Sequence, residues 1–169
     1  MSNKGNRETE VKLLIKFPAD FLDNHRDIEK SEIVQTYLES PVGVTARIRK
    51  RVYSDKTLYY KTEKIRLTKL TAIENEGEIS EEEYQKCLES EDKNRRPIIK
   101  TRYCYPYDGH IIEIDVYPFW QDRAIMEIEL SDESEEYSIP DEITVIKDVS
   151  ADKRYKNASL AKEIPFDEI

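Results

Sequence analysis

The sequence contains few of the residues on which many enzyme classes depend. Its 169 residues include four glycines, two cysteines and two histidines. No GxGxxG or GxxxxGK phosphate-binding loop occurs, which argues against Rossmann and P-loop folds. Cys87 and Cys104 cannot form a disulfide framework and lack the CxxC spacing of zinc sites. Because His25 and His110 leave little scope for histidine chemistry, we expect the working groups to be carboxylates, lysines and arginines.

Long hydrophobic runs are also missing. No apolar stretch approaches the length of about 18 residues that a transmembrane helix needs, so we expect no membrane partner. The opening segment MSNKGNRETE lacks the apolar centre of a secretory signal, which favours a cytoplasmic protein. The net charge is −9, from 27 basic and 36 acidic residues, so we expect no long nucleic acid as partner. The length suits one domain over residues 1–169, as a monomer or a homodimer.

Most of the chain alternates polar and apolar residues with a period of two, which is typical of half-buried β-strands. The strands expected on this basis cover residues 8–16, 33–38, 45–52, 57–64, 70–79, 98–105, 110–117, 124–131 and 143–146. Helices are expected at 18–30, at 159–163, and from the capping box Ser80-x-x-Glu83 to about residue 89. Asp108-Gly109 predicts a hairpin turn. The pattern indicates a mainly β (α+β) protein, an antiparallel barrel of eight or nine strands with few helices.

The polar face of these strands is almost purely charged, and the sign of the charge is sorted by strand. The acidic pairs are Glu8/Glu10, Glu74/Glu76, Glu113/Asp115 and Glu127/Glu129. The basic positions are Lys12, Arg47/Arg49, Lys61 and Lys100/Arg102. One interpretation is a sheet whose polar face is simply in water. The other is a barrel with the charged face inside, which would have to hold water, metal ions and an anion because unpaired buried charges are costly.

The first strand carries the motif E-x-E-x-K as Glu8-Thr-Glu10-Val-Lys12, which places two carboxylates and an ammonium along one strand face. Here the sequence resembles the CYTH, or triphosphate tunnel metalloenzyme, superfamily, and specifically its short bacterial members. Six further segments resemble that family in order: Thr45–Arg49, Leu58–Lys61, Glu74–Glu76, Lys100–Tyr103, Glu113–Val116 with Met126–Leu130, and a closing segment from Asp152 to Ala161. The sequence departs from the family at Ala72, where an arginine is common.

The resemblance implies a closed eight-stranded antiparallel tunnel that binds a triphosphate together with Mg²⁺ or Mn²⁺. The residues that would hold the phosphates are Lys12, Arg47, Arg49, Lys61, Lys100, Arg102 and Arg154. The metal ligands would be Glu8, Glu10, Glu127 and Glu129, with Glu74, Glu76, Glu113 and Asp115 as further acids of the tunnel. Glu8, Glu10, Lys12 and Glu129 would be catalytic, with glutamates orienting a metal-activated water and accepting its proton.

The function expected from this resemblance is a metal-dependent triphosphate hydrolase, with inorganic triphosphate as the favoured small substrate. Two other enzymatic alternatives are a class IV-type adenylyl cyclase and a nucleoside or thiamine triphosphatase. A third alternative, of a different class, is a non-catalytic polyphosphate- or nucleotide-binding module. The acidic pairs argue against this module, because a pure anion binder gains nothing from repelling its ligand.

Overall fold

The computed structural model describes residues 6–169, so residues 1–5 of the predicted 1–169 domain lie outside the described part. The strands are β1 (Asn6–Lys16), β2 (Glu29–Leu38), β3 (Val44–Val52), β4 (Thr57–Arg66), β5 (Thr71–Ile79), β6 (Ile98–Tyr107), β7 (His110–Val116), β8 (Arg123–Leu130) and β9 (Val145–Asp148). The helices are α1 (Ala19–Asn24), α2 (Glu81–Cys87) and α3 (Asn157–Leu160), with 3₁₀ turns η1 (Leu88–Ser90) and η2 (Lys153–Tyr155). In the described chain, no helix has the length and apolar content needed to cross a membrane.

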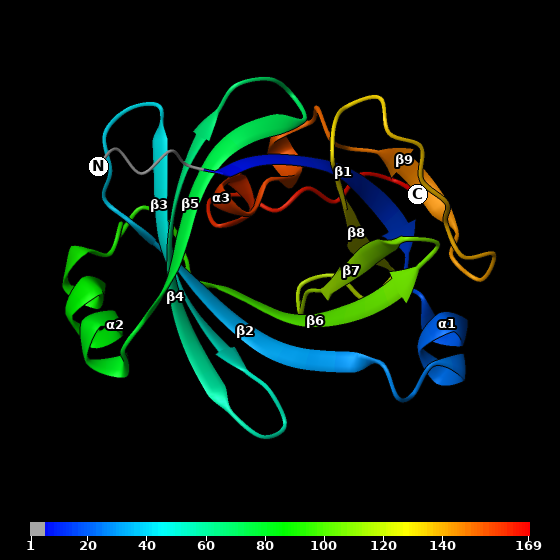
Figure 1. The fold of residues 1–169 in the computed structure, drawn as a ribbon, viewed down its shortest axis with the longest axis horizontal. Helices are drawn as coiled ribbons and strands as arrows, with labels where there is room; N and C mark the ends of the chain where they lie inside the picture. The colour runs from blue at the N-terminus through cyan, green and yellow to red at the C-terminus, as the bar shows by residue number, and fades with distance from the viewer. Residues whose placement is uncertain (1–5) are drawn as a thin grey trace.

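Eight of the strands form a closed antiparallel ring (Figure 1). Hydrogen-bonded neighbours follow the order β5-β4-β3-β2-β6-β7-β8-β1, and β1 closes the ring by pairing with β5 through Thr9 and Thr71. Strand β9 adds to β1 at Leu13–Ile15, beyond the stretch that β5 covers. The mainly β, eight-stranded antiparallel fold expected from the sequence is therefore confirmed.

Helix α1 is shorter than the sequence pattern predicted, and the hairpin turn is as expected. Helix α1 ends at Asn24 rather than near residue 30, and β2 begins at Glu29. Helix α2 continues into η1 up to Ser90, close to the predicted end near residue 89. Ser80 caps α2 by accepting a hydrogen bond from the backbone N–H of Glu83 at 3.1 Å. The turn between β6 and β7 has positive φ at both Asp108 (50°) and Gly109 (80°), the geometry that an Asp-Gly hairpin provides.

The outer face of the ring is apolar and is covered in two places (Figure 1). On β1, the outward side chains of Val11, Leu13 and Ile15 belong to a core that includes Phe21 of α1. On the other side of the ring, Tyr84 of α2 packs with a smaller cluster that contains Ile48. Burial of this apolar face stabilises the ring. The residues that alternate with it along each strand point into the ring.

The inward face is divided between an apolar part and a charged part. Leu14 and Ile125 lie opposite each other on β1 and β8, and the neighbouring inward pair on the same strands is Lys12 and Glu127. The apolar part is filled from the C-terminal segment, which contributes buried side chains such as those of Tyr155 and Leu160. Figure 1 shows α3, in red, within the outline of the ring. The C-terminal segment thus fills one part of the interior and leaves the charged part open.

Candidate functional site

A cavity of about 610 Å³ lies in the charged part of the ring. Its acidic lining consists of Glu8, Glu10, Glu74, Glu76, Asp92, Glu113, Glu127 and Glu129. Its basic lining consists of Lys12, Arg47, Arg49, Arg51, Lys64, Arg66, Arg95, Arg102 and Lys156. Much of the charged face is therefore enclosed rather than turned to bulk water, since Lys12, Arg49, Arg102 and Glu127 are each at most 9% exposed. Glu76 and Glu129 of the same lining are exposed.

Eleven of the predicted site residues line this cavity together, and they come from strands far apart in the sequence. They are Glu8, Glu10, Lys12, Arg47, Arg49, Glu74, Glu76, Arg102, Glu113, Glu127 and Glu129. Ring closure explains this convergence, because it brings the inward positions of β1, β3, β5, β6, β7 and β8 around one space.

Lys61 does not line the cavity, and its predicted place in the tunnel needs correction. It lies directly opposite Ile48 on β3, and Ile48 is buried in the outer cluster with Tyr84. Residues opposite each other in an antiparallel pair share a face, so Lys61 is on the outside of the ring. The lysine of β4 that lines the cavity is Lys64, which lies opposite Thr45.

Arg154 is the second residue whose predicted place needs correction. It is exposed, and its guanidinium pairs with Asp152 at 2.8 Å and with Asp167 at 2.9 Å, away from the cavity lining. The cation that the same segment contributes to the cavity is Lys156. The segment is irregular between η2 and α3, so no strand or helix periodicity marks which of its cations faces inward.

Lys100 and Asp115 lie beneath the cavity rather than in its lining. Their side chains are fully buried, and Lys100 Nζ lies 2.7 Å from Asp115 Oδ2. Arg102 donates two further hydrogen bonds to Asp115, at 2.7 and 2.9 Å, and reaches Glu113 at 2.6 Å. The two cations hold the pKa of Asp115 well below its usual range, against the raising effect of burial. This cluster fixes the Arg102 guanidinium at the floor of the cavity.

The acidic wall of the cavity is formed by Glu8, Glu10, Glu74, Glu76, Glu127 and Glu129. Within it, the pKa values of Glu10 and Glu127 shift in opposite directions. Burial raises the pKa of Glu10 to about 8, and the nearby charges of Glu127 and Glu8 add to the rise. Burial acts on Glu127 in the same sense but is outweighed by Lys12, whose Nζ lies 3.4 Å away, and its pKa falls to about 2. Lys64, whose Nζ lies 3.9 Å from Glu10, offsets the rise only in part, so Glu10 is less well compensated by positive charge than Glu127.

The basic wall of the cavity contains Arg47, Arg49 and Arg102. On this wall, Arg49 lacks full compensation by negative charge. Burial, together with the neighbouring charges of Arg47 and Arg102, lowers the pKa of Arg49 to about 10. Gln35 Oε1 accepts hydrogen bonds from Arg49 Nη2 at 2.9 Å and Nε at 3.3 Å, but an amide supplies no negative charge. The Nε atom of Arg47 is buried without a hydrogen-bond partner. An anion in the cavity would meet both needs.

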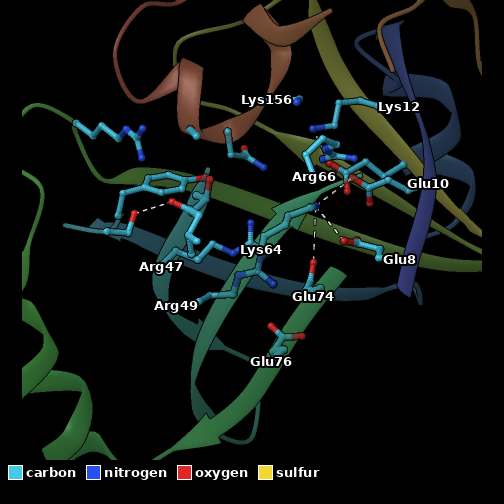
Figure 2. A pocket seen from close by; sticks show the side chains of 18 of the residues that line it. Glu8, Glu10, Lys12, Arg47, Arg49, Lys64, Arg66, Glu74, Glu76 and Lys156 are labelled. Atoms are coloured by element: carbon cyan, nitrogen blue, oxygen red, sulfur yellow. Dashed lines mark hydrogen bonds and ion pairs between the residues drawn. The ribbon is translucent and has the colours of Figure 1, made fainter. Parts of the chain in front are cut away.

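The carboxylates of Glu8, Glu10 and Glu74 surround the ammonium of Lys64 (Figure 2). Glu8 Oε2 and Glu74 Oε2 are buried but have no partner with hydrogen-bond geometry. In residues 6–169, no three acidic, histidine or cysteine side chains converge closely enough to form a cation site as they stand. The carboxylates nevertheless fit a hard divalent cation, because such ions take oxygen ligands and these two oxygens are engaged by the ammonium of Lys64, at 2.9 and 3.7 Å.

Several lining residues were missed by the sequence reasoning. Arg51 continues the alternation of Arg47 and Arg49 on β3 and was available from that pattern. Lys64 and Arg66 share the inward face of β4 with Thr62, which lies opposite Arg47. The alternation of β4 could have identified Lys64 and Arg66, if Thr62 rather than Lys61 had been taken as the residue that faces inward.

Comparisons with known proteins agree with the observed fold. The family model of the CYTH domain matches residues 6–163. The crystal structure of the inorganic triphosphatase NE1496 is 27% identical, covers 94% of this chain and 97% of its own, and has a TM-score of 0.57. A conserved hypothetical protein from Pyrococcus furiosus is also 27% identical, with 75% and 80% covered and a TM-score of 0.58.

More distant structures share the fold alone. HpAC1 from Hippeastrum, a proposed adenylyl cyclase described as having a dominant triphosphatase activity, is 18% identical, with 74% and 80% covered and a TM-score of 0.55. No curated protein sequence matches the chain.

Proposed function

The chain belongs to the CYTH domain family, and on this basis we propose that it hydrolyses inorganic triphosphate with a divalent cation, Mg²⁺ or Mn²⁺. The similarity to an inorganic triphosphatase over nearly the whole of both chains supports the choice of substrate. The cyclase alternative has no such support, because HpAC1 is similar in fold only.

The observation that carries the proposal is a cavity lined by acidic and basic side chains, in which Glu10 and Arg49 are incompletely compensated by opposite charge. The acidic wall raises the pKa of Glu10, which a cation would reverse. The basic wall lowers the pKa of Arg49 and leaves a buried Arg47 nitrogen unpaired, which an anion would relieve. A triphosphate with a bound cation presents both charges within one small ligand.

The phosphates would be held by cations from several strands, among them Lys12, Arg47, Arg49 and Arg102. Arginine is suited to this role because its planar donors can bind two phosphate oxygens at once. Lys64, Arg66 and Lys156 take the places first expected of Lys61 and Arg154. Lys100 contributes indirectly, since its ammonium is committed to Asp115 beneath Arg102.

The cation would be held by Glu8, Glu10, Glu127 and Glu129, with Glu74 and Glu76 beside them. A bound divalent cation neutralises charge on phosphate oxygens and acidifies a water molecule. Glu129 is the residue best suited to accept the proton of the attacking water. Before a cation binds, partial desolvation and the charges of Glu8, Glu113 and Glu76 raise its pKa, so protons are attracted to this carboxylate.

The direct test is phosphate release from inorganic triphosphate, ATP and thiamine triphosphate, each with Mg²⁺, Mn²⁺ or EDTA. We expect release from inorganic triphosphate that requires the cation and is much slower with the other two substrates. Equal release with EDTA would contradict the metal requirement. Tight triphosphate binding without release from any substrate would favour the non-catalytic binding module instead.

A further inference from the structure

Lys64 places a positive charge among carboxylates of the acidic wall (Figure 2). Its Nζ lies 2.9 Å from Glu8 Oε2, 3.7 Å from Glu74 Oε2 and 3.9 Å from Glu10 Oε1. These acids come from the two strands that close the ring, β1 and β5. The side chain of Lys64 is only 19% exposed, so water screens little of this attraction.

We infer that Lys64 is an internal counter-ion that occupies the place of the divalent cation, and that the cation binds by displacing its ammonium. The inference rests on the proposed function, because it concerns the same acidic wall. An ammonium and a hard divalent cation seek the same carboxylate oxygens, and two positive charges within about 4 Å of each other repel strongly in a partly dry site.

The arrangement of the carboxylates supports displacement rather than joint occupancy. Among the described residues these acids do not converge as a ligand set, although Glu8 and Glu74 each have a buried oxygen without a hydrogen bond. The acids are spread around an ammonium, which accepts looser geometry than a metal ion does. A cation would therefore draw them inward as Lys64 leaves.

Strand register and the flexible side chain explain how the exchange can occur. Lys64 lies directly opposite Glu74 on the paired strands β4 and β5, so its backbone is fixed at the acidic wall. Its four-carbon stem can still swing into the 610 Å³ cavity, towards the basic wall that contains Arg47. The displaced charge then becomes available to an anion, so binding of the cation strengthens binding of triphosphate and the reverse.

The test is Mn²⁺ binding without triphosphate, measured by calorimetry and by the thermal shift that Mn²⁺ produces. We expect Lys64→Met to bind Mn²⁺ roughly five- to hundredfold more tightly than the wild type, the usual range for coupling between sites. The matched control is Lys61→Met, which removes the same charge three residues away on the outer face and should leave the affinity unchanged. Lys64→Arg retains a competing charge and should show no gain.

The outcomes separate this inference from the proposed function. If the wild type binds Mn²⁺ and hydrolyses triphosphate but Lys64→Met shows equal or weaker Mn²⁺ affinity, displacement is wrong and the function stands. If neither the wild type nor Lys64→Met binds Mn²⁺ without triphosphate, this inference is overturned, whereas the metal requirement is decided separately by triphosphate hydrolysis with Mn²⁺ and with EDTA. Should Lys64→Met fail to fold, Lys64→Gln keeps a polar head group without the charge and is expected to show the same gain.

Discussion

Lys12 and Glu127 lie directly opposite each other on strands β1 and β8, and Lys12 Nζ is 3.4 Å from Glu127 Oε1 inside the ring. Lys12 Nζ also donates to the backbone carbonyl of Tyr155, at 3.5 Å, in the C-terminal segment. One residue of the first strand thus connects the acidic wall with the segment that fills the apolar part of the ring. The stability of the fold should therefore depend on the charge state of Glu127.

This dependence leads to a prediction for acid unfolding. The pKa of Glu127 is about 2 in the folded protein, against an ordinary value of 4.5. A lowered pKa stabilises the fold fully above about pH 4.5, and the stabilisation is lost as the pH falls towards 2. Glu127→Gln should cost about 3 kcal/mol of unfolding free energy at pH 7 and much less near pH 2, as urea unfolding at several pH values can measure. A cost that does not change with pH would rule out the carboxylate charge as its source.

The catalytic role of Glu129 predicts a loss of turnover with little loss of binding. Glu129→Gln removes the proton acceptor while keeping the shape of the side chain. Because Glu129 is also a proposed cation ligand, kcat for triphosphate is measured at saturating Mn²⁺, and it should fall by about a hundred- to ten-thousandfold. KM should change little if the phosphates are held by the basic wall. The matched control is Glu63→Gln, an exposed change on β4 at a position opposite Ala46 of the outer cluster. A near-native kcat for Glu129→Gln would exclude it as the base.

Much of the fold and of the site could be predicted from the sequence, because period-two alternation and charge sorting are local signals. The pairs Arg47/Arg49 and Glu127/Glu129 were placed correctly on the inward face for this reason. Lys61 was misplaced because its position depends on which face of β4 meets Arg47, a matter of strand register. Nor could local pattern predict that inward Leu14 would be covered by the C-terminal segment, since that contact joins residues far apart in the chain.

The corrected assignment in the C-terminal segment predicts different effects for two cations that lie two residues apart. Lys156 lines the cavity, so Lys156→Ala should raise KM for triphosphate several-fold with little change in kcat. Arg154 points away and pairs with Asp152 and Asp167 on the surface, so Arg154→Ala should leave KM unchanged. Steady-state kinetics of the two variants decides between them. The reverse pattern would restore Arg154 to the site and displace Lys156 from it.

The buried cluster beneath the cavity predicts a large loss of stability that is separate from catalysis. Asp115 is the shared partner of Lys100 and Arg102, and its side chain is fully buried. Asp115→Ala leaves the buried ammonium of Lys100 without its carboxylate and removes two hydrogen bonds from Arg102. Removal of one partner of a buried ion pair typically costs about 3–5 kcal/mol. Urea unfolding at pH 7 should show this loss, whereas Asp55→Ala in the exposed turn between β3 and β4 should be nearly neutral. If Asp115→Ala were as stable as the control, the cluster could not be what fixes Arg102 at the cavity floor, and its guanidinium would have to be positioned by Glu113 and Glu127 instead.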